Sequence, residues 1–519
     1  MSASSLTPSA DLDPGSAPAQ EPYHILSKQQ KWNLVIFVSL AGCFSPLSSN
    51  IYFPALATIS KDLGVSATLA SLTVTVYMVV QGITPSLFGA FSDSCGRRLT
   101  FATSLTIYTA ANLALAFTSS YPMLMVLRGM QAAGSAATIS ISAGVIADIA
   151  LPEERGGFMG TNAGLRMTGQ AIGPVIGGLL NSAWGFRSIF WFLFTLSIIV
   201  LGALLIFLPE TQRDIAGNGS NPLTGWHKPL IYTFRSPKVW SGDSNGRALL
   251  CPRKPVTLRN TFSSLAYLLE KDIAALLAWG SVAYTAWSMV TSSTTTLLLR
   301  GFPLLTQWQL GLFFLPNGVG CICGSLSIGW LLDHGFQRAV SQGKTAGSNP
   351  RAPRMDEPSP DDPKSRRSPN PTPERANSYI NSRLRYMPLF ALTLVVSLAL
   401  YGPSFEFNDI NHGSSANLAA PLILQFIIAF SATAIFNINS TVLIDYFPDR
   451  PASATALNNM CRCLLGAAGV STIELLIQAV KPMKAFFVVA AIVVLFMPLV
   501  WMQWVWGERW RGEREAALA

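Results

Sequence analysis

An arginine lies inside one of the apolar stretches of this sequence, at a depth where a charge needs a cavity or a partner. Arg128 is seven residues into the apolar run 122–148, about 10 Å along a helix that rises 1.5 Å per residue. A charge inside a membrane is costly and normally marks a functional site. Gln131, Ser135 and Ser142 follow at helical spacing, which predicts a polar stripe facing the bundle interior. The alternative is a structural arginine that pairs with a helix end.

Two further arginines occupy equivalent places in the two halves of the chain. Arg166 and Arg462 each lie about ten residues into an apolar run, and 296 positions separate them. The same step relates Asn162 to Asn458, Gly173 to Gly469 and Pro152 to Pro448. These matches indicate two halves that repeat in the same orientation, with a site near the midplane between them. Either arginine could contact cargo, or bind helix ends and loop acids such as Asp93 and Glu153 in a gate.

A transporter coupled to protons also needs an acid that can take up a proton. The candidates are Asp148, Asp445 and Glu474, of which the first two lie close to the ends of their runs. Glu474 is deeper, in the outer half of its run, where burial disfavours a charged carboxylate. We therefore favour Glu474 as the residue that carries the proton. The competing explanation is that Glu474 forms a hydrogen bond between helices.

A stripe of small residues follows Arg166. Gly169, Gly173 and Gly177 recur every fourth residue, with Gly178 beside the last of them, and Pro174 weakens the backbone ladder near its centre. Such a stripe predicts close packing against another helix.

A charged turn joins the second and third apolar runs. Gly89 permits close approach of two helices, Asp93 ends one helix, Gly96 allows a reversal, and Arg97 and Arg98 supply positive charge. We expect this turn, together with Arg155, Arg166 and Arg462, to form the gate. Asp93 is placed to meet the N-terminus of the eleventh run when that side of the protein is shut.

Aromatic and amide side chains scattered along the runs are candidates for the cargo cavity. They would suit amphipathic or cationic organic molecules, although single aromatic residues in membrane spans more often serve packing. The candidates are Asn50, Tyr52, Gln81, Gln131, Tyr284, Trp287, Asn317, Gln425 and Asn437.

Composition identifies the class of protein that positions these groups. Of 519 residues, 50% are hydrophobic and 12% charged, which predicts an all-α protein that crosses the lipid bilayer many times. The net charge of +9 lies mostly in loops and tails, so it indicates loops on the cytoplasmic side and not nucleic-acid binding. All four histidines lie in tails or loops and no phosphate-binding loop is present. These observations argue against an enzyme, a metal site and an ATP-driven pump, and we expect no cofactor.

Twelve apolar runs predict twelve transmembrane helices in two pseudo-symmetric six-helix bundles. We expect a disordered cytoplasmic tail at 1–30, bundles at 31–211 and 271–506, a cytoplasmic linker at 212–270, a long disordered cytoplasmic loop at 333–385 and a cytoplasmic tail at 507–519. Basic residues concentrate on one side, which places both termini in the cytoplasm. Without a cleavable signal peptide, the first span would direct membrane insertion.

The loop from Gly89 to Arg98 resembles a signature of the major facilitator superfamily between its second and third spans. Arg128-Gly-Met-Gln131 resembles the fourth-helix motif in which the arginine is linked to proton transfer, and the stripe from Gly169 to Gly178 resembles the antiporter motif. The segment around Asn458 and Arg462 is similar to the eleventh helix of fungal twelve-span drug:proton antiporters of the DHA1 type, nearest to quinidine-resistance-like members.

This resemblance implies a proton-coupled exporter of small organic molecules such as drugs, toxins or secondary metabolites, working by rocker-switch alternating access. It would be a monomer in the plasma membrane, or alternatively in the vacuolar membrane. A proton symporter or facilitator that imports a nutrient remains open, as does a sensor without transport.

Overall fold

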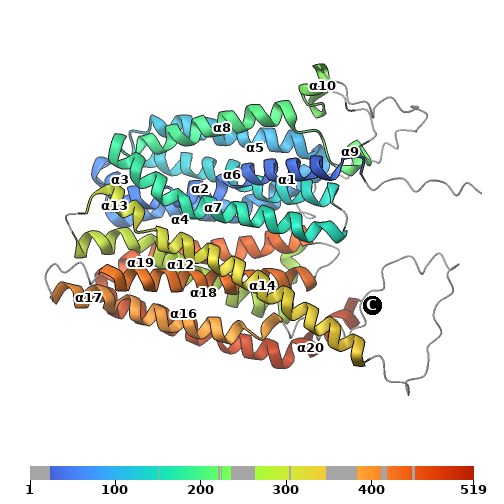
Figure 1. Ribbon diagram of the computed structural model, residues 1–519. Helices are drawn as coiled ribbons and strands as arrows, with labels where there is room; N and C mark the ends of the chain where they lie inside the picture. The colour runs from blue at the N-terminus through green and yellow to red at the C-terminus, as the bar shows by residue number, and fades with distance from the viewer. Residues whose placement is uncertain are drawn as a thin grey trace, which may run out of the picture.

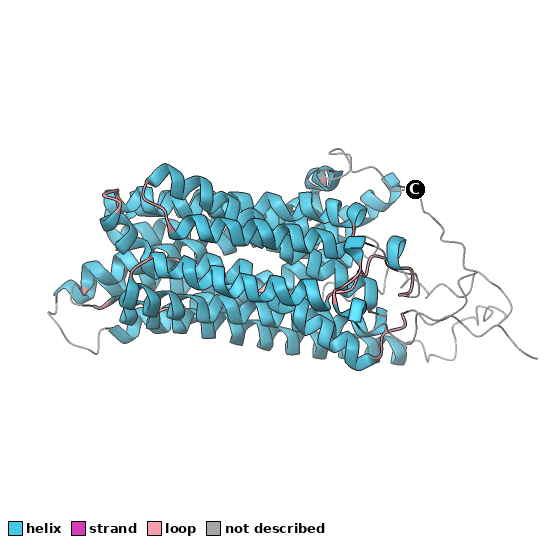
Figure 2. Ribbon diagram, turned by 90° about the horizontal axis from the view of Figure 1, so that it is seen from above, coloured by secondary structure: helices cyan, strands magenta, loops and turns pink. Residues whose placement is uncertain are grey.

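The computed structural model describes residues 24–150, 152–219, 223, 225–234, 263–302, 305–346, 383–410, 418–446 and 451–518. All regular secondary structure in these ranges is helical, which confirms the predicted all-α fold (Figure 2). Much of the predicted tail, linker and long loop lies outside the described residues, as do the side chains of Arg155 and Asp333.

Two groups of helices lie side by side (Figure 1). The N-terminal group consists of α1 (Lys28–Gly42), α2 (Phe44–Asn50), η1 (Phe53–Ala55), α3 (Leu56–Asp62), α4 (Ala67–Cys95), α5 (Arg97–Ala116), α6 (Tyr121–Ile149), α7 (Pro152–Trp184) and α8 (Arg187–Phe207). The C-terminal group consists of α12 (Lys271–Gly301), α13 (Gln307–Leu312), α14 (Leu315–Ala346), α16 (Met387–Tyr401), α17 (Pro403–Ile410), α18 (Ala419–Tyr446), α19 (Pro451–Phe496) and α20 (Pro498–Leu518). Short helices α9 (Arg213–Ala216), η2 (Gly225–His227), α10 (Ile231–Phe234) and η4 (Ser263–Leu269) belong to the connection between the groups.

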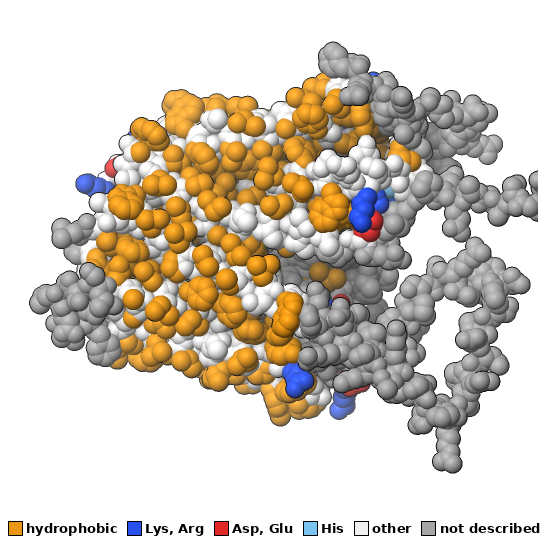
Figure 3. Space-filling view, viewed as in Figure 1, with side chains coloured by type: hydrophobic (Ala, Val, Ile, Leu, Met, Phe, Trp, Pro, Cys, Tyr) orange, Lys and Arg blue, Asp and Glu red, His pale blue; other side chains and the backbone are white. Residues whose placement is uncertain are grey.

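Each group surrounds its own hydrophobic core. One core draws on residues from Leu34 to Leu208, joined by Phe314, Ala467 and Val470, and the other on residues from Ile273 to Val500. Helix α1 begins and helix α20 ends at the same end of the molecule, which we call the terminal end (Figure 1). We call the opposite end the far end. Hydrophobic side chains cover the middle of the visible face, as a lipid-facing surface requires (Figure 3).

Ten helical segments among the described residues are long and apolar enough to cross a membrane. One of them, Ala454–Arg514, joins α19 to α20 and contains a break at Lys481, whose φ of 67° leaves the helical region just before Pro482. Helix α7 is not among the ten, because glycines and polar residues dilute its apolar character, yet it has 33 residues and runs beside the other helices (Figure 1). Adding α7 and dividing the broken segment gives the twelve crossings that the sequence predicts.

Equivalent contacts in the two groups confirm the internal repeat. The amide of Asn162 on α7 donates to Ser142 of the preceding helix at 3.4 Å, and Asn458 on α19 donates to Ser440 at 2.9 Å. Gly173 packs against the backbone of α2 in the first span of its half, and Gly469 packs against α12 in the first span of the other half. Residues 296 positions apart therefore make matching contacts.

Two predicted boundaries need correction. The loop expected at 333–385 starts later, because α14 stays helical to Ala346 and the first proline after its apolar part is Pro350. The tail expected at 507–519 is helical to Leu518, and Arg514 of α20 forms an ion pair of 2.8 Å with the buried Asp272 at the start of α12. This ion pair ties the end of the chain to the C-terminal group.

Candidate functional site

A small cavity lies between the two helix groups. Its volume is about 30 Å³, and it is lined by side chains from α7, α12, α18 and α19, namely Met167, Gln170, Tyr284, Trp287, Ala432, Thr433, Phe436 and Arg462. A space of that size has room for about one water molecule, so its walls must separate before it admits an organic solute.

Arg462 is held in this cavity by neighbours that leave its charge uncompensated. Its guanidinium group donates two hydrogen bonds to Oδ1 of Asn459, at 2.7 and 3.2 Å. The same group lies 4.8 Å from the ring centroid of Tyr284 and 4.9 Å from that of Phe436. Neutral partners orient the group, and its positive charge stays available to a ligand.

Arg166 lies beside the cavity on α7, one residue before Met167 and one helical turn before Gln170. Its buried Nε has no hydrogen-bond partner, and its charge is near enough to that of Arg462 for the two to repel each other. The ion pairs found among the described residues include neither arginine. The structure thus brings the predicted symmetric pair together as two like charges without a carboxylate between them.

The far end of the cavity is closed by contacts between the two groups. Gly178 of α7 packs backbone to backbone against Gly311 of α13, and Asn181 donates to Gln307 at 3.1 Å. Nearby, Phe53 of η1 stacks on Phe314 with ring centroids 6.2 Å apart, and its carbonyl accepts a hydrogen bond from Thr295 of α12 at 3.1 Å.

Along α7 the packing is looser toward the terminal end. Among the described residues, a Cβ added at Gly157, Gly160 or Gly164 would meet nothing within 4 Å, unlike the tightly packed glycines later in the same helix. Helices α7 and α14 also diverge toward this end (Figure 1). The half-buried arginine pair is therefore nearer to open space at the terminal end than at the far end.

The charged turn forms a compact network at the terminal end. Arg97 bonds to Asp148 of α6 at 2.9 Å and to Ser92 at 3.1 Å, and it forms an ion pair with Asp93 one turn earlier. The side chain of Asp93 is 66% exposed, and its ion partner among the described residues is Arg97. Its predicted contact with the start of α19 stays a prediction for the state in which this end is shut.

Glu210 anchors the same turn, and sequence reasoning did not identify it. Its buried carboxylate accepts hydrogen bonds from the backbone amides of Arg97 and Arg98 at the start of α5, at 2.8 and 3.3 Å, and contacts His227 at 3.0 Å. Burial alone would raise the pKa of Glu210, but these hydrogen bonds outweigh it and hold the pKa below its usual value. Gly96 has a φ of 104°, and a side chain there would collide with Glu210.

Arg98 complements this contact by binding the C-terminal end of α8, just before Glu210. It donates to carbonyl oxygens at the C-terminus of α8, including that of Leu205 at 2.8 Å, and to the carbonyl of Trp226 at 2.9 Å. The connection after α8 is thereby fastened to the turn. The only sequence signal for the role of Glu210 is its position as an acidic residue directly after a long apolar run.

Arg128 lies in a sealed polar pocket inside the N-terminal group. It is 0% exposed, donates to Gln131 at 2.6 Å, and lies 4.0 Å from the ring centroid of Tyr52 and 4.4 Å from that of Tyr77. Its Nε and one terminal nitrogen have no hydrogen-bond partner. Gln131 continues the network to Asn112 at 2.7 Å. The predicted interior polar stripe is present, with tyrosine rings as the neighbours of the charge.

The predicted proton-coupling residues lie apart. Asp148 pairs with Arg97 and is twenty residues beyond Arg128, about 30 Å along the helix. Glu474 pairs with Arg300 of α12 at 3.1 Å and accepts from Gln478 at 3.3 Å. The third acid considered, Asp445, pairs with Arg383 at 3.1 Å. A role for any of them in proton transfer stays a prediction.

The glycine stripe packs as predicted. Side chains at Gly169 and Gly177 would collide with Cys43 and with the carbonyl oxygen of Ile51, and one at Gly173 would meet the backbone nitrogen of Ile51 at 3.2 Å. Pro174 lies inside the helix, where its carbonyl oxygen faces Gly311. These contacts bind α7 to the first span and, through Gly178, to the other half. An antiporter role for the stripe is not tested by its packing.

Two of the nine predicted cavity residues, Tyr284 and Trp287, line the central cavity. The others belong to packed polar contacts, which are Asn50 to Pro46, Tyr52 to Thr73, Gln81 to Ser45, Gln131 to Asn112, Asn317 to Trp287, Gln425 to Thr294, and Asn437 to Ser325. Sequence reasoning missed Gln170, although it follows Arg166 by one helical turn and so shares its face.

Comparison with known proteins decides the family. The profile of the Major Facilitator Superfamily matches residues 38–343. The chain belongs to this superfamily. It is therefore a secondary transporter and not an enzyme, as the sequence predicts.

Relatives and a solved structure extend this assignment. Citrate exporter 1 of Aspergillus niger is 42% identical over 99% of this chain and 93% of its own length. MFS antiporter QDR2 of Candida albicans is 30% identical over 92% of this chain and 89% of its own. The crystal structure of the human organic anion transporter MFSD10 (TETRAN) has a TM-score of 0.55 at 17% identity, covers 91% of this chain and 99% of its own, and supports the fold alone. Citrate exporter 1 is more similar to this chain than MFS antiporter QDR2 is.

Proposed function

We propose that this protein exports a small organic anion carrying two or more carboxylates, such as citrate, by alternating access between its two bundles. The observation that carries the proposal is the pair Arg166 and Arg462, two like charges at the interface without an acid partner. Gathering like charges in a poorly hydrated interior is unfavourable, and a bound polyanion would relieve that cost. The likeness to a citrate exporter supports the same choice.

The electrostatics of the cavity favour anions over the cationic cargo expected from the aromatic residues. The ring of Tyr284 already faces the guanidinium group of Arg462, and this positive charge would repel an organic cation in the cavity. A planar guanidinium group can bind a carboxylate through two parallel hydrogen bonds, and two such groups would select an anion with more than one carboxylate.

In the proposed cycle, residues 31–211 and 271–506 form the two moving bundles and the terminal end faces the cytoplasm. The anion enters from the looser terminal end, binds between Arg166 and Arg462, and leaves when the far-end contacts separate. We propose protons as the counter-ion that drives export, with Arg128 as part of the coupling path. A plasma-membrane location would place the far end outside the cell.

Uptake of radiolabelled citrate into sealed lipid vesicles that contain the purified protein tests the proposal. With the terminal end facing the bath, the wild type should accumulate citrate, and Arg462→Gln should lower the initial rate at least about tenfold through loss of a charged hydrogen bond. Arg509→Gln is the matched control, since Arg509 is 79% exposed on α20 and pairs with Glu513. Movement of an organic cation dye without citrate would refute an anion exporter.

A pH gradient distinguishes antiport from the alternative of proton symport. The pH range is kept where citrate retains its full charge, so that the substrate itself does not change. An acidic vesicle interior should accelerate uptake if protons leave in exchange for citrate. Acceleration by an acidic bath would instead show that citrate and protons move together.

A further inference from the structure

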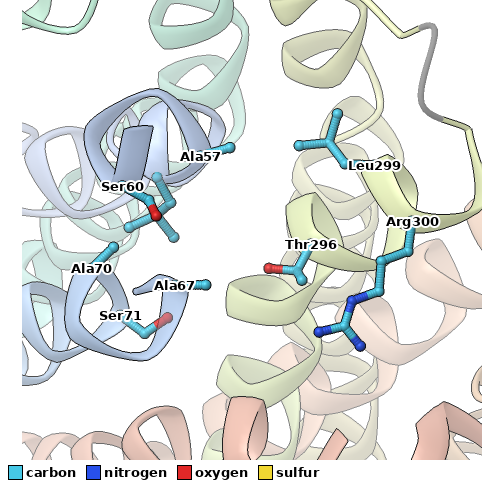
Figure 4. A pocket seen from close by; sticks show the side chains of 9 residues that line it. Ala57, Ser60, Ala67, Ala70, Ser71, Thr296, Leu299 and Arg300 are labelled. Carbon is cyan, nitrogen blue, oxygen red and sulfur yellow. The ribbon is translucent and has the colours of Figure 1, made fainter. Parts of the chain in front are cut away.

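A second cavity lies between the two groups near the far end. Its volume is about 260 Å³. It is lined by side chains of α3, α4 and α12, namely Leu56, Ala57, Ser60, Ala67, Ala70, Ser71, Thr296, Leu299 and Arg300. The hydroxyls of Ser71 and Thr296 point into the gap from opposite walls, and the guanidinium group of Arg300 extends along its edge (Figure 4).

This far-end cavity is separate from the central one. Thr296 follows the cavity-lining Trp287 by about 13 Å of helix at 1.5 Å per residue. The bond from Thr295 to the carbonyl of Phe53 and the stacking of Phe53 on Phe314 close the passage between the groups at this level. A solute released past that seal would enter the far-end cavity before it reached the surrounding solution.

Among the described residues that line the far-end cavity, Arg300 is the only charged one, and it forms an ion pair with one buried acid. Its side chain is 46% exposed, whereas Glu474, its ion partner at 3.1 Å, is 3% exposed. The other neighbour of this carboxylate is the neutral amide of Gln478. Lys61 and Asp62, which follow the lining residue Ser60, are exposed on α3 and are not part of the lining.

We propose that the far-end cavity is a second anion site, at which the carboxylate of an exported or external organic anion binds Arg300 with help from Ser71 and Thr296. The nature of the anion rests on the proposed function. A charged Glu474 competes with the anion for Arg300 and so lowers the affinity of this site for the anion. A low affinity suits a site through which the anion leaves the protein. Removing that charge leaves Arg300 to the anion alone.

Equilibrium binding of radiolabelled citrate to the purified full-length protein in a neutral detergent tests this site. The central site is first removed with Arg166→Gln and Arg462→Gln, and the thermal unfolding of each variant checks that it folds. On that background, one weak citrate site should remain. Glu474→Gln should strengthen it at least about tenfold, and Arg300→Gln should abolish it, as expected for a charge-assisted hydrogen bond.

Lys61→Gln is the matched control, because it removes the same charge at the same end outside the cavity and should leave the residual affinity unchanged. Residual binding that is absent even with Glu474→Gln, or that survives Arg300→Gln, would overturn the second site. Neither result would affect the proposed function, which citrate transport by the wild type in vesicles tests separately.

Discussion

Single residues decide what the central cavity can bind. Arg462 is oriented by hydrogen bonds to Asn459 and by the rings of Tyr284 and Phe436, and both kinds of contact depend on a planar guanidinium group. Lysine would keep the positive charge, but it lacks the planar, forked set of N–H donors and stacks less well on aromatic rings. We therefore expect Arg462→Lys to raise the Kd for citrate about tenfold, and Arg462→Gln to raise it further, measured by equilibrium binding. Equal affinities of the two variants would show that the charge of Arg462 does not contribute.

The sequence predicts some of these residues and not others for a physical reason. Arg166 and Arg462 are predicted because the internal repeat places them at equivalent positions. Gln170 is not predicted, although helical periodicity puts it on the same face as Arg166. Glu210 cannot, because its contact with the amide of Arg97 joins positions more than a hundred residues apart and depends on how α5 and α8 pack. The roles of acids and aromatic residues in the spans also depend on packing that the sequence does not show. Asp148 and Glu474, for example, lie far apart and pair with different arginines.

At the scale of helices, the glycines of α7 make different contacts along its length. A methyl group at Gly177 would collide with the carbonyl oxygen of Ile51, whereas one at Gly164 would meet nothing within 4 Å. Gly177→Ala should lower the thermal unfolding temperature and abolish transport, because the first span and α7 must separate to make room. Gly164→Ala should leave transport intact and gain up to about 1 kcal/mol of helix propensity. If both variants unfold and transport alike, the close approach at Gly177 has no energetic importance.

The contact of Glu210 with the start of α5 should make stability depend on pH. The pKa of Glu210 is lowered in the folded protein from a reference of 4.5, so its stabilising effect is present above that value and disappears as pH falls through the lower, folded value. Glu210→Gln removes the charged acceptor for the backbone amides of Arg97, Arg98, Thr211 and Gln212, and it should cost about 2 kcal/mol near neutral pH. Unfolding temperatures measured across pH should show the gap between wild type and variant closing below about pH 4.5. A gap that is constant with pH would exclude the charge as its cause.

Secondary structure is predictable here to a different degree in different elements. The apolar runs identify the crossings, including α7 with its polar residues, because a membrane span needs about twenty predominantly apolar residues. The ends of α14 and α20 extend beyond their apolar parts, since helix propensity and contacts such as Arg514 with Asp272 continue where hydrophobicity stops.

At the scale of the whole molecule, contacts of α7 with α13 hold the two bundles together at the far end, so transport requires these far-end contacts to break. Asn181 of α7 and Gln307 at the start of α13 are hydrogen-bonded across this interface at 3.1 Å. Replacing both with cysteine and oxidising the pair should lock the far end shut. Citrate transport should then stop and return on reduction, while citrate binding from the terminal end persists. The single variants Asn181→Cys and Gln307→Cys should transport under both conditions. Transport that continues with the cross-link formed would mean that cargo passes without separation of the bundles, which contradicts alternating access.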